Sequence, residues 1–124
     1  MKIIATLLFI GIFFISTEKT TAQPISVIGH TSAFAPASAT SINIATPGGV
    51  QQNDFLLAHI AGRVILGFTL SPPAGWTLLR KMKSGNQFGT HIFYKIADAS
   101  EPLSYTFTDS SGSMLYDKLG VISV

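Results

Sequence analysis

Clusters of turn-forming residues interrupt this chain at short intervals, and that spacing restricts it to a fold built from short elements. The clusters are rich in Pro, Gly, Asn, Asp and Ser and lie at 47–49, 72–75, 84–86, 98–102 and 109–112. The runs between them are rich in β-branched and aromatic residues, and none keeps a helical period over ten residues. Short strands at this spacing are typical of antiparallel sandwiches and barrels.

We therefore predict an all-β chain, an antiparallel β-sandwich of the jelly-roll or immunoglobulin-like kind with about eight short strands. The stretch of small residues at 33–41 is interpreted as a loop or a loose edge. The predicted strands are 25–29, 40–45, 54–61, 64–70, 76–82, 90–97, 103–108 and 119–124.

Two of these segments show how the strands should be buried. In 103–108, the residues Leu103, Tyr105 and Phe107 alternate with hydroxyl residues, which predicts one core face and one solvated face. The run 55–61 is apolar at every position except His59. This run is predicted to be a central strand covered on both faces.

The N-terminus has the layout of a secretory signal peptide. Lys2 gives a positive start, the 13 residues 3–15 are almost all apolar, and Thr20 and Ala22 are small residues before a cut at Gln23. A membrane-crossing helix needs about 20 apolar residues. We expect a signal peptide at 1–22, one β-sandwich domain at 23–124, and a secreted protein, extracellular or at the cell surface, with no membrane span after signal removal.

Composition excludes several classes of function. The absence of cysteine rules out a disulfide scaffold, a thiolate zinc site and a cysteine nucleophile. Residues 23–124 carry six basic and five acidic side chains, a net charge of +1. Binding to nucleic acid would need a basic stripe or patch, so no nucleic-acid partner is expected.

Three motifs occur in the order found in a family of β-sandwich modules from secreted bacterial surface proteins. Residues 47–58 (PGGVQQNDFLLA) resemble its P-x-G-V-x-x-G-D-x-L-L-A signature, 72–77 (PPAGWT) its P-P-A-G-W-T turn, and 94–107 its Y-K-V-A-x-A-x-E-P-x-S-Y-T-F segment. The resemblance implies a bacterial, non-catalytic module of adhesion-like type whose ligand is unassigned.

The chain departs from this family at two places. Asn53 stands where the family has glycine, a mild change because Asn tolerates a left-handed turn. The family module usually continues with further strands, and 116–124 matches its next strand poorly. This poor match and the apolar end at 121–124 predict that the chain is only the N-terminal part of such a module. An unpaired edge is then expected to be exposed at 119–124.

Seven residues are predicted to shape turns or the core. Trp76, the single tryptophan, is either a stacking platform for a sugar or a core anchor placed by the preceding turn; an indole of this size favours the anchor. Asp54 is expected to bind loop amides at the start of a strand. The whole set is Asp54, Pro72, Pro73, Gly75, Trp76, Glu101 and Pro102.

The remaining candidates concern ligands. Arg80, Lys81 and Lys83, with Phe88 after them, form the only basic cluster, which could contact a phosphate or an acidic glycan. The alternative is a solvated strand end whose charges discourage edge pairing. Phe88 belongs to the loop that follows this cluster.

The titratable residues give no local motif for chemistry. A metal site of His30, His59 and His91 would need neighbouring strands, and neither a His-x-His pair nor a nearby carboxylate favours it. Asp98 and Glu101 share a turn that offers few oxygens for calcium. No nucleophile elbow, phosphate loop or zinc-protease motif occurs. We predict no catalytic residue, no metal ligand and no cofactor.

The expected function is a secreted, non-catalytic β-sandwich module of a surface or adhesion type, whose partner is a glycan or a surface protein. Two alternatives remain open. One is a small secreted hydrolase that uses a carboxylate pair or a histidine. The other is a non-functional fragment of a longer surface protein.

Overall fold

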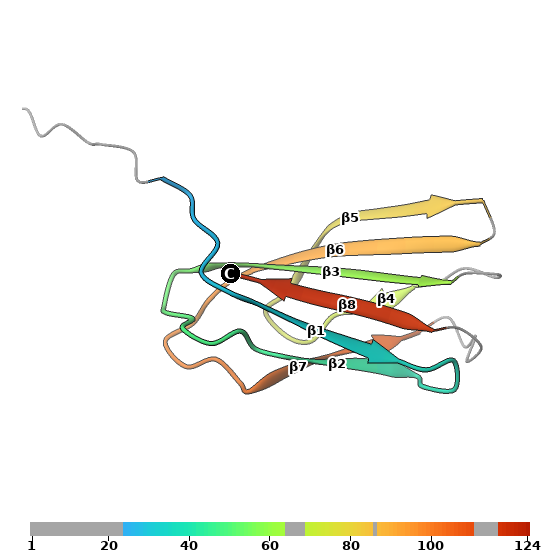
Figure 1. Cartoon of the computed structure of the whole chain (residues 1–124), viewed down its shortest axis with the longest axis horizontal. Helices are drawn as coiled ribbons and strands as arrows, with labels where there is room; N and C mark the ends of the chain where they lie inside the picture. The colour runs from blue at the N-terminus through green and yellow to red at the C-terminus, as the bar shows by residue number, and fades with distance from the viewer. Residues whose placement is uncertain (1–23, 64–68, 86, 111–116) are drawn as a thin grey trace, which may run out of the picture.

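The computed structural model describes residues 24–63, 69–85, 87–110 and 117–124, and every regular element in that part of the chain is a β-strand (Figure 1). The strands are β1 (His30–Ala35), β2 (Ser41–Ala45), β3 (Phe55–Arg63), β4 (Leu70–Ser71), β5 (Thr77–Ser84), β6 (Phe88–Ile96), β7 (Ser104–Asp109) and β8 (Lys118–Ser123).

The strands form two antiparallel sheets that pack against each other. One sheet has five strands in the order β1-β8-β3-β6-β5, and the other has three in the order β2-β7-β4. Each pairing that joins neighbouring strands is antiparallel. The predicted all-β sandwich of about eight strands is therefore confirmed.

The core lies between the two sheets and follows from the alternation of side chains along each strand. An aromatic cluster occupies its centre. The Trp76 ring meets the Tyr105 ring edge-on at 5.0 Å between centroids and the Phe107 ring at 5.5 Å, and Phe93 lies 5.3 Å from Phe107. The aliphatic core residues are Ile42, Ile44, Leu56, Ile60, Leu70 and Ile122.

The first strand lies further along the chain than the prediction placed it. Residues 25–29 form no strand, whereas His30–Ala35 pairs with β8 along its whole length. Of the two interpretations of 33–41, a loop or a loose edge, the loop is wrong for Ala33 and Ala35, which belong to the edge strand β1. Both face the core, and Ala35 is buried. Their small side chains gave no strand signal, because pairing with β8, which is distant in sequence, is what orders them.

The predicted exposed edge at 119–124 is also wrong. β8 is hydrogen-bonded to β1 on one side and to β3 on the other, so it lies inside the five-stranded sheet. The edges of that sheet are β1 and β5. The apolar pattern of 118–124 is that of an internal strand, and Val124 extends the ladder by hydrogen bonds with Ile28 and Gly29.

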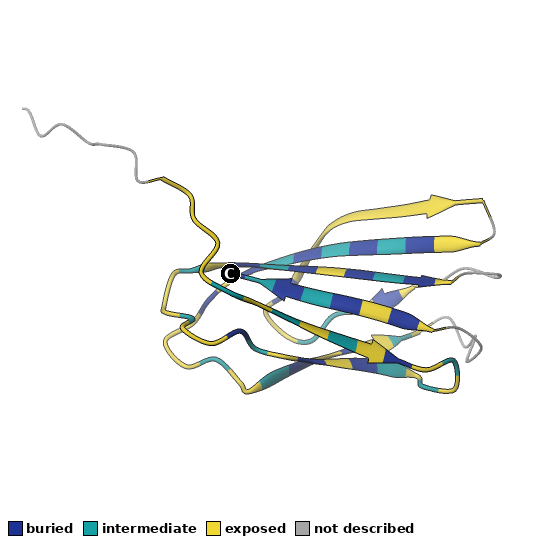
Figure 2. Ribbon diagram, in the orientation of Figure 1, coloured by how far each residue is buried: buried dark blue, intermediate teal, exposed yellow. Residues whose placement is uncertain are grey.

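The edge strand β5 is exposed at every position, including Leu78 and Leu79, and Figure 2 shows it in the exposed colour throughout. Its pairing with β6 is irregular between Leu78 and Arg80. Within the described residues, Lys81 of β5 is hydrogen-bonded to Thr69, which precedes the two-residue strand β4 of the other sheet. Most of the predicted strand 64–70 lies outside the described residues.

Candidate functional site: the outer face of the five-stranded sheet

The surface of the five-stranded sheet that points away from the second sheet, called here the outer face, is apolar and open to solvent. The prediction that the run 55–61 is covered on both sides is wrong, because β3 is central in its sheet but buries only alternate residues (Figure 2). The large side chains that the outer face exposes are Phe34, Phe55, Met82, Phe88, Ile96 and Leu119.

Strand register arranges the outer face in rows that cross all five strands. The middle row runs from Ser32 through Val121, His59 and Ile92 to Arg80. Thr90 lies in the next row, and its hydroxyl is hydrogen-bonded to His59 Nε2.

The three-stranded sheet shows what an ordinary solvated face of this protein looks like. Its outward residues on β2 and β7 are small or hydroxyl-bearing, and Asn43 donates hydrogen bonds to the hydroxyls of Ser104 and Thr106. The contrast within one molecule shows that the apolar outer face is not a general property of its surface. Exposed apolar patches of this kind mark contact sites.

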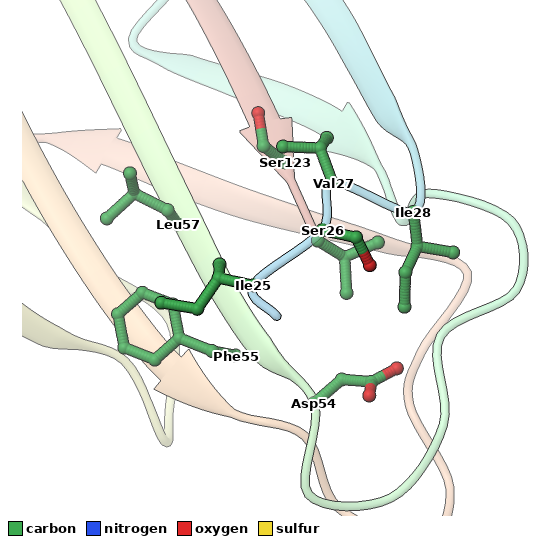
Figure 3. A pocket seen from close by; sticks show the side chains of 9 residues that line it. Ile25, Ser26, Val27, Ile28, Asp54, Phe55, Leu57 and Ser123 are labelled. Carbon is green, nitrogen blue, oxygen red and sulfur yellow. The ribbon is translucent and has the colours of Figure 1, made fainter. Parts of the chain in front are cut away.

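A hollow of about 290 Å³ lies at one end of the outer face (Figure 3). Ile25, Val27 and Ile28 contribute one wall from the segment before β1, while Phe55 and Leu57 of β3 contribute another. The ring of Phe55 stacks on that of Tyr94, 5.8 Å between centroids. The hollow is thus an apolar continuation of the outer face.

Two further hollows lie toward the other end of the same face. One, of about 320 Å³, is lined by the apolar Phe34, Phe88 and Leu119 and by the charged Arg63, Asp117 and Lys118. The second, of about 350 Å³, is lined by residues that include His59, Met82 and Lys83. Large apolar side chains therefore lie at both ends of the sheet, and at this end charged residues accompany them.

The four predicted ligand contacts do not form one basic site. Arg80 lies in register with Ile92, on the outer face. Lys81 instead donates a hydrogen bond to the Thr69 hydroxyl, 2.8 Å away, toward the second sheet. Lys83 and Phe88 line a hollow whose other walls are largely apolar. An anion would therefore meet no set of converging cations here.

The predicted turn residues lie at one end of the sandwich, where Lys95 of β6 joins several of them. Gly75 has a φ of +84°, and a Cβ there would lie 3.1 Å from Lys95 Cε, so both the turn and the close approach require glycine. The turn is closed by a bond from Trp76 N to Pro73 O, and Trp76 is buried. A buried indole offers no stacking platform.

Lys95 and Glu101 form a buried ion pair that the sequence did not reveal. Lys95 Nζ lies 2.8 Å from each carboxylate oxygen of Glu101 and 2.9 Å from Asp98. It also lies 5.6 Å from the centre of the Tyr105 ring. Burial lowers the pKa of Lys95, but hydrogen bonds and charge from Glu101 and Asp98 outweigh it and raise the net value above the usual one.

The other predicted turn residues serve the loops beside this pair. Asp54 accepts a hydrogen bond from the Gln51 amide at 2.7 Å, and Asn53 has a φ of +73°. The carbonyl of Pro102 accepts from the Thr46 hydroxyl, and Pro72 is half-buried. The first contact fixes the loop between β2 and β3, and the second joins that loop to the one between β6 and β7.

The three histidines do not converge. His91 points into the core and is buried, whereas His30 and His59 lie on the outer face. In the described ranges, no group of three or more His, Asp or Glu side chains is placed to hold a metal ion.

Burial lowers the pKa of His91 to about 4, with the Lys81 charge acting in the same direction and Asp109 opposing it. An unfolded histidine titrates near 6.5, so the full stability is present above that value and falls as the pH approaches 4. We expect the free energy of unfolding to drop by about 2 kcal/mol between pH 7 and pH 5. Urea titrations at each pH would measure it.

A matched pair of variants tests whether His91 is the source of this pH dependence. His91→Gln should flatten the dependence between pH 7 and pH 5, and His59→Gln, on the outer face, should retain it. If the free energy of unfolding of His91→Gln fell as steeply between pH 7 and pH 5, a group other than His91 would be responsible for the pH dependence.

Comparison with protein-family models, with curated proteins and with solved structures finds no match for this chain. Within the described residues, no helix is long and apolar enough to cross a membrane. The fold class is that of an antiparallel β-sandwich, and its most distinctive surface is the outer face.

Proposed function

We propose that this chain is a secreted, non-catalytic β-sandwich module of a surface or adhesion type, and that it acts through contacts made by its outer face. The single observation that carries the proposal is the exposure of large apolar side chains across the whole of one sheet. Phe34 is 64% exposed and Phe88 is 61% exposed, although they lie on strands at different positions in the sheet.

The character of this face favours a macromolecule over a small substrate. It is broad and shallow rather than a deep cleft, and its central polar pair is already hydrogen-bonded. The secretion signal at 1–22 agrees with a role outside the cell. The buried charges of Lys95 and Glu101 serve the fold, since both are bound to each other.

The test compares two leucine variants in a bead-attachment assay. Leu119 lies on the outer face, and Leu103, which is 93% exposed, lies beside the three-stranded sheet. Beads carrying the secreted protein would be applied to surfaces coated with collagen, fibronectin or mucin. We expect wild-type beads to attach to at least one coating, Leu119→Lys to reduce attachment about tenfold or more, and Leu103→Lys to preserve it.

Attachment that is insensitive to Leu119→Lys, or absent from every coating, would contradict the proposal. Turnover of chromogenic esters or glycosides that survives Leu119→Lys would favour a hydrolase instead.

A further inference from the structure

We infer that the outer face pairs with the outer face of a second copy of this chain, giving a two-fold symmetric pair of sandwiches. This inference rests on the proposed function, because it names a partner of the same surface. The pair must open before that face can contact a coating, so pairing and attachment compete for it. In a two-fold interface the same patch serves both partners, so the patch must be complementary to itself in shape and charge.

The area of the outer face approaches what a stable pair needs. Strands lie about 4.8 Å apart and rise about 3.4 Å per residue. Five strands of six to nine residues therefore present on the order of 500 Å² of flat sheet, and more as accessible surface. The walls formed by Ile25 and Val27 extend it further. A standard interface buries about 800 Å² on each partner.

The charges of the outer face also allow self-pairing. The charged side chains in its rows are Arg80, at the β5 end of the middle row, and Arg63, at the end of β3. Asp54, Lys83 and Asp117 line the hollows at its margins. The other titratable groups in the rows are His30, His59 and Tyr94. Both arginines lie outside the centre of the face, so the centre of a pair would bring no arginine or lysine charges together.

The central polar groups would tolerate loss of water. His59 and Thr90 are hydrogen-bonded to each other, so burying them leaves that bond intact. Two twisted sheets can pack face to face with their strands about 30° apart, and identical sheets have identical twist. An anionic membrane would instead favour a larger basic rim.

Sedimentation velocity of the secreted protein over a range of about 1 to 100 μM provides the test. We expect wild type and Leu103→Lys to form dimers, and Leu119→Lys to weaken dimerisation about 100-fold or more, because it buries a lysine in both copies. Phe88→Lys, on another strand, should have the same effect. Circular dichroism of the monomers would establish that both variants are folded.

Each other outcome has a definite meaning. A wild-type protein that stays monomeric, or a dimer equally stable in Leu119→Lys and Leu103→Lys, would overturn the inference. A monomer that binds phosphatidylglycerol vesicles through Leu119 would overturn it in favour of a membrane. A monomer that attaches to coated surfaces through Leu119 would overturn self-pairing, while the proposed function would stand. Dimerisation without attachment to any coating would contradict the proposed function, while self-pairing would stand.

Discussion

Replacing Lys95 with methionine is expected to lower the free energy of unfolding by about 3–5 kcal/mol at pH 7. Lys95 and Glu101 are each only 7% exposed, and the lysine contacts both carboxylate oxygens. Without the ammonium group, Glu101 keeps the Asp98 amide as a donor, but its negative charge is buried without a counter-ion. Urea unfolding followed by Trp76 fluorescence would measure the loss.

Two further variants separate the buried pair from surface charge. Asp98 is 74% exposed, so Asp98→Asn should cost less than about 1 kcal/mol. Adding Glu101→Gln to Lys95→Met should recover much of the loss, because it removes the orphaned charge. If Lys95→Met and Asp98→Asn were equally destabilising, the buried pair would not be the source of the effect.

A methyl group at Gly120 is expected to destabilise the sandwich by about 2–3 kcal/mol. Gly120 lies on β8 and faces the second sheet, where a Cβ would overlap Ile44 Cδ1 and lie 3.1 Å from Ile42 Cδ1. Both isoleucines are fully buried, so a close-packed core must shift to accept the methyl group. Urea unfolding of Gly120→Ala would measure this cost.

The clash can be tested by removing the atom that causes it. Ile44→Val deletes Cδ1 and should cost about 0.5–1.5 kcal/mol alone. Combined with Gly120→Ala, it should give a total loss clearly smaller than the sum of the two. Gly48→Ala is the matched control, because a Cβ there meets nothing within 4 Å. Simple additivity of Gly120→Ala and Ile44→Val would rule out this contact.

The fold could be predicted because its signals are local. The turn at Pro73–Trp76 and the alternation around Tyr105 and Phe107 each depend on neighbouring residues, and the structure shows both. β1 carries weak local signals, since Ala33 and Ala35 become strand residues only through pairing with β8. Pairing between distant segments cannot be read from composition or periodicity.

The candidate site was harder to predict for a related reason. The apolar run in β3 predicted burial on both faces, whereas its outer residues, among them Phe55, remain exposed. An apolar contact surface and a buried strand have the same sequence pattern. The partner of Glu101 was missed because no local pattern marks Lys95 as buried, and lysine side chains seldom are. Its surroundings come from other elements, namely the Tyr105 ring and the turn at Gly75.

The position of β8 has a consequence for how the protein is made. β1 is hydrogen-bonded within its sheet only to β8, and β8 separates it from β3. During synthesis, the first strand therefore has no place in the sheet until more than eighty further residues have followed it. Loop closure over that distance makes the sheet slow to assemble. The five-stranded sheet is therefore completed at its β1 edge only after β8 has been synthesised.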